Sequence, residues 1–294
     1  MNREEPPLRL ATGVPGLDAR LGGGLIPGTL TVVVGATGIG KTQLGLQFAG
    51  AVQPPEPHGP VLDMSSRGDS QAHASYANRL WGRSLDAADD RPVDPAEFHR
   101  AWRPGGYLRA FDYSGRRVTR NDMEFEAWQQ WQEEINRKLD RAIAFLYGNF
   151  CRGARRAVVD GIEPVDRPSD SIQFYLFDYL YHQVFRKDAE WVARDLFRQH
   201  YRRCAEEAAR HAYDPDAVGC MLLVTSHETM LDDLIERPLT DGDPLSNANT
   251  LILMGKSRDD GRMRRALHIA KHRGSVCDDG LIPYRVTDQG VALE

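Results

Sequence analysis

The chain has 294 residues, of which 41% are hydrophobic and 27% are charged, and its formal net charge at pH 7 is −5. This composition is typical of a globular protein, and the acidic balance argues against a generally basic nucleic-acid-binding protein. At this length the chain could form one large domain or two small ones. No apolar run approaches the length of a membrane span, and the first residues lack the apolar segment of a secretion signal.

The four cysteines are scattered, with no spacing typical of a metal site and no disulfide framework. They are Cys151, Cys204, Cys220 and Cys277. We therefore expect reduced thiols in a cytoplasmic protein that has no membrane partner.

The β-branched run 30–34 leads into a glycine-rich loop, and a helical pattern follows at 43–49. Residues 35–42 read Gly-Ala-Thr-Gly-Ile-Gly-Lys-Thr, which fits the phosphate-loop pattern Gly-x-x-x-x-Gly-Lys-Thr. Glycines allow successive backbone N–H groups to face a phosphate group, and the following helix presents the positive end of its dipole. Lys41 would contact the β- and γ-phosphates, and the Thr42 hydroxyl would bind Mg²⁺. The predicted residues for binding ATP are Gly35, Thr37, Gly38, Ile39, Gly40, Lys41, Thr42 and Gln43.

Predicted strands and helices alternate along the chain. This alternation predicts an α/β fold with a mainly parallel, twisted sheet flanked by helices. The longest predicted helix covers 122–150. The predicted strands are 29–35, 60–65, 106–112, 155–160, 219–225, 249–254 and 264–271, with a short terminal pair near 283–293.

Residues 163–217 separate two core strands and form a predicted helical insertion, with helices at 169–187 and 188–212. The first helix has apolar residues at four-residue steps and aromatic residues on several faces. Two interpretations remain open: the aromatic residues pack within a helical hairpin, or they form a docking surface for a protein partner.

Polar groups follow two of the predicted buried strands. The apolar run Ala157-Val158-Val159 ends in Asp160, which is the pattern of the second Mg²⁺ ligand of a phosphate-loop protein. The strand 219–225 ends in polar residues, of which Thr225 or Ser226 could contact the γ-phosphate. His227 fits a structural role equally well.

The late strand 264–271 has apolar residues that alternate with polar ones, and cations follow at its end. Lys271 and Arg273 lie on one face of the strand because side chains two residues apart share a face. Such a face suits contact with an anion, although a solvated strand end would have the same pattern.

Together these residues resemble the KaiC family of the RecA-like ATPases. The likeness lies in residues 12–18 and 21–24 before the phosphate loop, in Asp160, and in 265–275 followed by 284–290. It implies a single RecA-like core over 1–294, with 163–217 inserted. It also implies ATP at the subunit interfaces of a hexameric or related homo-oligomeric ring. In that family a Lys-x-Arg pair reaches the γ-phosphate of the neighbouring subunit, so the resemblance gives Lys271 and Arg273 a catalytic role beside Lys41.

The chain departs from the family at two places. Hydrolysing members usually carry adjacent glutamates after the strand that follows the phosphate-loop helix, whereas Ser65 and Ser66 stand there in this chain. A serine cannot act as a base unless another group takes its proton, and the nearby Asp63 and Asp69 lack the family's spacing. Pro244 and Leu245 align with the autophosphorylated pair of the clock protein, so we predict no autokinase activity.

Two functions are therefore compatible with the sequence. The first is a slow Mg²⁺-dependent ATPase that acts in a ring, and the second is a nucleotide-gated scaffold that docks a partner through 163–217. A DNA-binding filament is a weaker hypothesis, since the chain is acidic and outside the insertion its basic residues cluster only at Arg258, Arg262, Arg264 and Arg265.

Overall fold

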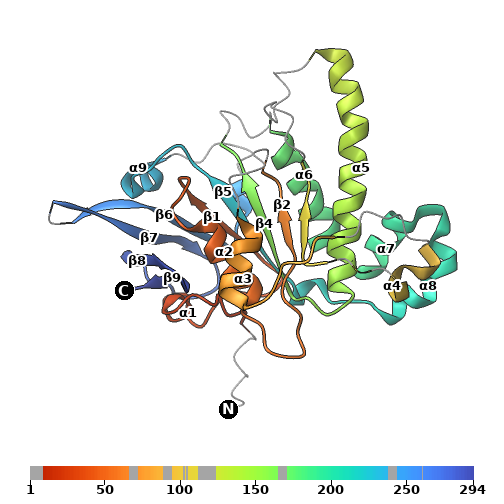
Figure 1. The fold of residues 1–294 in the computed structure, drawn as a ribbon, viewed down its shortest axis with the longest axis horizontal. Helices are drawn as coiled ribbons and strands as arrows, with labels where there is room; N and C mark the ends of the chain where they lie inside the picture. Colours follow the sequence, from red (N-terminus) through yellow and green to blue (C-terminus); the bar gives the residue numbers. More distant parts are fainter. Residues whose placement is uncertain are drawn as a thin grey trace.

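The computed structural model describes residues 9–65, 72–88, 95–101, 103, 105–111, 124–164, 171–237, 244–259 and 261–294. Strands and helices alternate along most of the chain, and a run of antiparallel strands completes it (Figure 1). The strands are β1 (Leu30–Gly35), β2 (Val61–Asp63), β3 (Tyr107–Arg109), β4 (Arg156–Ile162), β5 (Gly219–Thr225), β6 (Thr250–Asp259), β7 (Arg262–His272), β8 (Leu281–Thr287) and β9 (Gly290–Leu293). The helices are α1 (Leu17–Arg20), α2 (Lys41–Gly50), α3 (His73–Trp81), α4 (Phe98–Ala101), α5 (Phe125–Phe150), α6 (Ile172–Leu180), α7 (Ala189–Phe197), α8 (Tyr201–Arg210), α9 (Leu231–Glu236) and α10 (Pro244–Asn247).

The strands of the described chain form one sheet, in the order β3-β2-β4-β5-β1-β6-β7-β8-β9. The strands from β3 to β6 in this order run parallel to one another, whereas the pairs β6–β7, β7–β8 and β8–β9 are antiparallel. The predicted α/β fold with a mainly parallel sheet is confirmed. Because parallel strands place their carboxyl ends at one edge, the loops after β1, β2, β4 and β5 meet there.

Helices cover both faces of the parallel sheet (Figure 1). Val32 and Val34 belong to the core that contains α5 and α6, whereas Val33 belongs to the core that contains α2 and α3. This division follows from the alternation of side chains along a strand. It explains why β1 is apolar throughout rather than at alternate positions, since both of its faces are buried.

Some predicted boundaries are wrong. The strand predicted to end at 254 continues to Asp259, and it forms with β7 a hairpin that extends beyond the neighbouring strands (Figure 1). The four arginines that carried the DNA-binding hypothesis lie on this hairpin. The predicted helix 122–150 is described from Phe125 onward, and residues 122 and 123 lie outside the described part.

The predicted helix 188–212 is wrong as a single helix. Arg198 divides it into α7 and α8, because its φ of 46° is incompatible with a right-handed helix. A 3₁₀ turn at Arg198–His200 joins the two helices. The direction of the chain therefore changes in the middle of the insertion.

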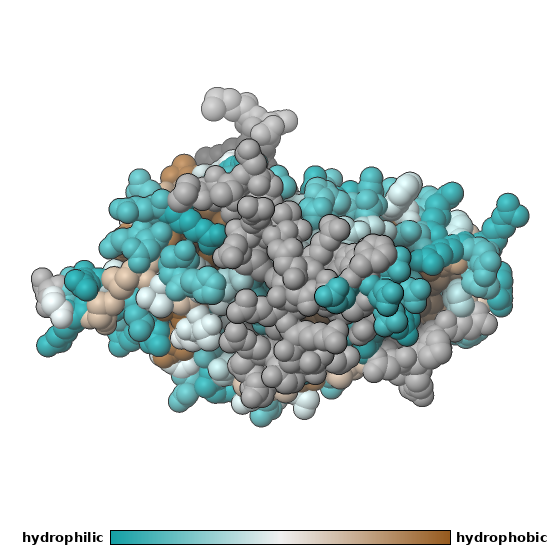
Figure 2. Space-filling view, turned by 90° about the horizontal axis from the view of Figure 1, so that it is seen from above, coloured by the Kyte–Doolittle hydropathy of each residue, from teal (hydrophilic) through white to brown (hydrophobic). Residues whose placement is uncertain are grey.

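Helix α6 is mostly buried. Ile172, Leu176, Phe177 and Leu180 are each less than 5% exposed and belong to the core that contains α5. Internal packing thus accounts for most of the apolar side chains of this helix. Tyr175, at 65% exposed, remains on the surface. The described surface in Figure 2 is mostly hydrophilic, as the charged composition predicts.

Candidate nucleotide site

The phosphate loop runs from the end of β1 to the start of α2. Gly38 and Gly40 adopt φ values of 76° and 115°, which residues with side chains rarely adopt. At Gly35 a Cβ atom would lie 2.4 Å from the carbonyl oxygen of Met254, so only glycine fits between β1 and β6. Ile39 is buried, and its carbonyl accepts a hydrogen bond from the Tyr284 hydroxyl at 2.8 Å. Contacts with Met254 and Tyr284 therefore hold one side of the loop in place, and the side with Gly38 and Gly40 remains open to a ligand.

Lys41 is the first residue of α2 and is only 7% exposed. Its Nζ donates to the carbonyl oxygens of Gly35 at 2.8 Å and Ala36 at 3.0 Å. Burial lowers the pKa of Lys41 to about 8, and the Asp160 carboxylate opposes this effect. The ammonium group is thus held inside the loop, where a phosphate group would compensate its burial.

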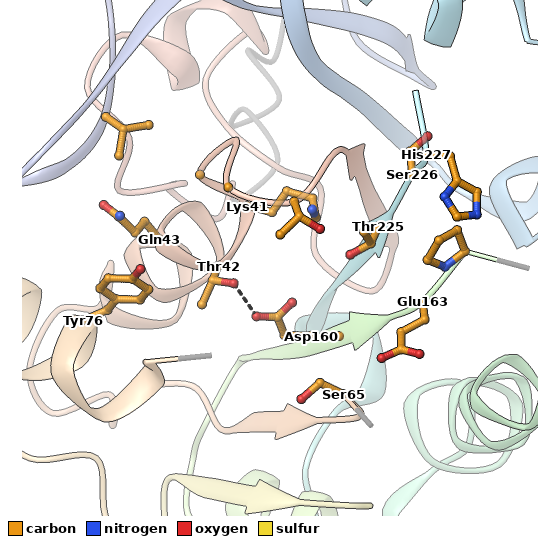
Figure 3. Close-up of a pocket in the computed structure, with 16 residues that line it drawn as sticks. Lys41, Thr42, Gln43, Ser65, Tyr76, Asp160, Glu163, Thr225, Ser226 and His227 are labelled. Carbon is orange, nitrogen blue, oxygen red and sulfur yellow. Dashed lines mark hydrogen bonds between the residues drawn. The ribbon is translucent and has the colours of Figure 1, made fainter. Parts of the chain in front are cut away.

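A cavity of about 350 Å³ opens above the loop, at the edge where the strand ends meet (Figure 3). This volume is in the range of ordinary small-molecule sites. Most of the predicted binding residues line it, whereas Gly35 and Ile39 support the loop. The lining residues are Thr37, Gly38, Gly40, Lys41, Thr42, Gln43, Ser65, Tyr76, Asp160, Gly161, Glu163, Pro164, Thr225, Ser226, His227 and Val286.

Thr42 and Asp160 meet in this cavity. The Thr42 hydroxyl donates to Asp160 Oδ2 at 2.7 Å, although the two residues are 118 positions apart (Figure 3). Asp160 lies on β4, is 2% exposed, and is in register with Asp63 on β2. Hydroxyl and carboxylate oxygens are hard ligands of the kind that Mg²⁺ prefers. The residues present therefore fit the predicted ion.

The loop, the cavity and the sheet order agree with a comparison of the chain with models of protein families. A family model described as "ATPase: KaiC" matches residues 10–54, a segment that includes β1, the phosphate loop and α2. No curated protein matches the chain. The chain therefore has a KaiC-like P-loop segment within an α/β sheet that is consistent with a RecA-like core. It is accordingly an ATP-binding protein, and the family resemblance predicted from the sequence is confirmed.

His73 is a residue of this KaiC-like site that no sequence pattern predicts. It is the first residue of α3 and is 2% exposed. Its Nε2 lies 2.9 Å from Asp160 Oδ2, and its Nδ1 lies 3.7 Å from Asp63 Oδ2. His73 therefore joins the aspartates of two adjacent strands and restricts the orientation of Asp160.

Ser65 lines the cavity at the place where the KaiC family usually has glutamate. Its Oγ is buried and makes no hydrogen bond to any residue that the structure describes. Ser66 and Asp69, the other two positions considered from the sequence, lie outside the described residues. Ser65 itself brings no proton acceptor of sufficient basicity to the site.

Asp63 does not replace the missing glutamate. It is 3% exposed, and its carboxylate accepts hydrogen bonds from the Ser65 N–H at 2.8 Å and the Tyr107 hydroxyl at 2.7 Å. Burial raises the pKa of Tyr107 above its usual range, and Asp63 adds to the effect, so the hydroxyl remains a donor. Asp63 thus supports the ends of β2 and β3 rather than facing a bound nucleotide.

The two ends of the cavity differ in character (Figure 3). At one end Tyr76 and Gln43 offer an aromatic ring and an amide. At the other end Glu163 follows β4, and residues 225–227 end and follow β5. The Ser226 hydroxyl donates to the carboxylate of Glu228. Neither Tyr76 nor Glu163 belongs to a recognisable motif, because each reaches the cavity only through the fold.

Lys271 and Arg273 lie far from the cavity of their own chain. On β6, Met254 pairs with Gly35 of the phosphate loop. Lys271 pairs with Leu251, which lies three residues before Met254. This separation is about 10 Å along the strand, in the direction away from the loop. Both side chains donate to the carbonyl oxygen of Ser246, at 2.9 and 3.4 Å. The two cations therefore lie at the opposite edge of the sheet from the nucleotide site.

Among the helices that the structure describes, none is both long and apolar enough to cross a membrane.

Proposed function

We propose that this KaiC-like protein is a slow, Mg²⁺-dependent ATPase that acts at the subunit interfaces of a homo-oligomeric ring. The contact between Thr42 and Asp160 beside the buried Lys41 carries the proposal. It brings a phosphate-binding cation and two metal-binding oxygens into one cavity of suitable size.

The phosphate loop and Lys41 would bind the β- and γ-phosphates. In the described part of the chain no cluster of three or more His, Cys, Asp or Glu residues could hold a metal ion. A Mg²⁺ ion would therefore depend on Thr42, Asp160 and the phosphate oxygens, as is usual for this ion. When bound, it would neutralise charge on the phosphates.

The position of Lys271 and Arg273 favours action on a neighbouring subunit. Since they lie at the sheet edge away from their own loop, they can reach an ATP molecule only in another copy of the chain. Such a contact joins two different surfaces of the chain, and repeated contacts of this kind close into a ring or continue as a filament. The family resemblance favours a hexameric ring. Burial and the neighbouring Arg273 lower the pKa of Lys271, which is what two cations poised for one anion would produce.

Slow turnover is expected because the glutamate that usually activates water is replaced. The described cavity wall has Ser65 in its place, so the cations and the metal ligands must contribute a large part of the rate enhancement.

The proposal is tested by measuring ATP turnover with Mg²⁺ for the wild type and two variants, Lys41→Ala and the double variant Lys271→Ala/Arg273→Ala. Each variant should lose about 10²–10³-fold of the turnover. A 1:1 mixture of the two variants should recover about one quarter of the wild-type rate. In mixed rings one interface in four would combine the intact loop of one subunit with the intact cations of its neighbour.

Wild-type turnover no greater than that of Lys41→Ala, with ATP still bound, would show a nucleotide-gated scaffold instead of an ATPase. A mixture as inactive as its components would show that the two cations do not act across an interface. Light scattering of the same samples gives the assembly state.

A further inference from the structure

Two carboxylates are found among the described residues that line the cavity, Asp160 and Glu163. Asp160 already contacts Thr42 and His73, as a metal ligand would. Glu163 lies at the end of the cavity formed by Ser226 and His227, on the opposite side of Asp160 from Tyr76 and Gln43 (Figure 3). A second carboxylate thus reaches the cavity near the ends of β4 and β5.

A bulge in β4 allows both carboxylates to face the cavity. Residues three apart in a regular strand point to opposite faces, but the pairing of β4 with β5 shifts register between Val159 and Ile162. Gly161 sits in this bulge with φ 92°. A Cβ atom there would lie 2.5 Å from the backbone nitrogen of Ser65, so the bulge requires glycine. The chain leaves β4 turned toward the cavity, and Glu163 follows.

Gln173 of α6 fixes the backbone on which Glu163 stands. Its side chain is 1% exposed, and its Oε1 accepts a hydrogen bond from the Glu163 N–H at 2.9 Å. Its Nε2 donates to the carbonyl oxygens of Gly161 at 3.1 Å and Met64 at 2.5 Å. One buried amide therefore ties the end of β4 to the residue before Ser65. A residue of the helical insertion thus forms part of the wall of the site.

Ser65 leaves room at this wall. A serine side chain has three heavy atoms fewer than a glutamate side chain, and Ser65 and Glu163 line the same cavity. A carboxylate that enters from the end of β4 can occupy the side of the cavity where a glutamate from β2 would otherwise lie (Figure 3).

We propose that Glu163 is the general base of ATP hydrolysis in this protein, an inference that rests on the proposed function. As the water oxygen bonds to the γ-phosphorus, the Glu163 carboxylate accepts the proton from the breaking O–H bond. The bond from the γ-phosphorus to the β,γ-bridging oxygen breaks, and ADP leaves with that electron pair. Glu163 then returns the proton to phosphate or solvent, which balances the reaction.

The test compares wild type, Glu163→Gln and Glu206→Gln with Mg·ATP. Glutamine keeps the shape of the side chain but cannot accept the proton. Glu206 is an exposed glutamate of α8 that pairs with Arg210, so its variant controls for the loss of one negative charge. We expect Glu163→Gln to lose about 10²–10⁴-fold in kcat, with its Kd for ATP within twofold of wild type. Glu206→Gln should match wild type in both.

A loss of kcat smaller than tenfold in Glu163→Gln would overturn the assignment while leaving the ATPase proposal intact. A parallel loss of ATP affinity would also overturn it, because it would show that Glu163 holds the nucleotide or the fold. Wild-type turnover equal to that of Lys41→Ala would instead reject the proposed function itself, so the two failures are distinguishable.

Discussion

The phosphate-loop side of the cavity and the β2–β4 side differ in how their residues are brought together. On the first side, consecutive residues 35–43 supply the glycines, Lys41 and Thr42. On the second side, the contact from His73 to Asp160 spans 87 positions and that from Gln173 to Met64 spans 109. The predicted phosphate site is therefore encoded locally, whereas the placement of Asp160 and of Glu163 depends on tertiary packing. We expect substitutions on the second side to change catalysis and metal affinity more than nucleotide binding.

After Glu163 itself, the largest of these effects is expected at His73, which contacts Asp160, the proposed metal ligand. His73→Ala removes the hydrogen bond to Asp160 and leaves two buried aspartates without the group between them. Loss of a group that orients a metal ligand typically weakens metal binding by about 10–100-fold. A Mg²⁺ titration of ATP turnover and of ATP binding measures this change.

His182 offers the matched control, because it is an exposed histidine that pairs with the surface residue Asp178, contacts the ring of Tyr181 and does not line the cavity. His182→Ala should leave the Mg²⁺ dependence unchanged. Equal Mg²⁺ affinity in His73→Ala and wild type would mean that Asp160 keeps its orientation without the histidine.

A smaller effect is expected at Gln173, which connects the insertion to the site. Gln173→Leu is similar in size but removes the hydrogen bonds to the Glu163 N–H and to two carbonyl oxygens, at a cost in unfolding free energy of about 1–3 kcal/mol. Displacement of Glu163 should also lower kcat about tenfold while ATP affinity stays within twofold. Urea unfolding and steady-state kinetics measure the two changes.

Gln183→Leu serves as the control for Gln173, because Gln183 lies in the same helical insertion and contacts the exposed Trp191. If Gln173→Leu destabilised the fold without lowering kcat, the insertion would have no part in positioning Glu163, and the two sides of the cavity would be less distinct than their contacts indicate.

The phosphate-loop side of the cavity is predicted well from the sequence, because adjacent residues supply its functional groups. The spacing of the glycines, Lys41 and Thr42 is typical of a phosphate-binding loop and of few other structures. The position of Asp160 in the site can also be predicted from the sequence, since a carboxylate at the end of an apolar strand is rarely tolerated without a partner. The positions of the parallel strands were predicted, because strands buried on both faces have continuous apolar runs, although β2 and β3 are shorter and β6 is longer than predicted.

The second side could not be predicted for a physical reason in each case. His73 meets Asp160 only because α3, which packs on α2, begins at the ends of β2 and β4, and no local sequence pattern predicts that placement. Glu163 and Gln173 fall inside the segment 163–217, which looks separate from the site when β4 is taken to end at 160. The bulge at Gly161 extends β4 to Ile162 and turns the chain, and glycine after aspartate is an equally common signal of a simple turn.

The smallest expected effect lies outside the cavity and tests whether the fold can change without the site. His99 of α4 stacks on His211 at 5.0 Å between ring centroids, and Tyr147 lies 3.5 Å from its Nε2. Burial, then His211 and Arg152, lower the pKa of His99 to about 4, whereas Glu207 opposes them. In the unfolded chain His99 has its ordinary pKa of 6.5. Between pH 6.5 and pH 4 the His99 side chain therefore binds a proton in the unfolded chain but not in the folded one.

The contribution of neutral His99 to the free energy of unfolding is therefore retained above pH 6.5 and falls as the pH drops from 6.5 to 4. Between pH 7 and pH 5 we expect the His99 contribution to be about 1 kcal/mol, after discounting for solvent screening of this partly enclosed ring. Urea unfolding at both pH values should show a smaller loss in His99→Phe than in wild type. ATP affinity at pH 7 should be equal in the two proteins, because no residue of the His99 contact lines the cavity. Equal losses of stability would show that His99 is not the group that binds the proton.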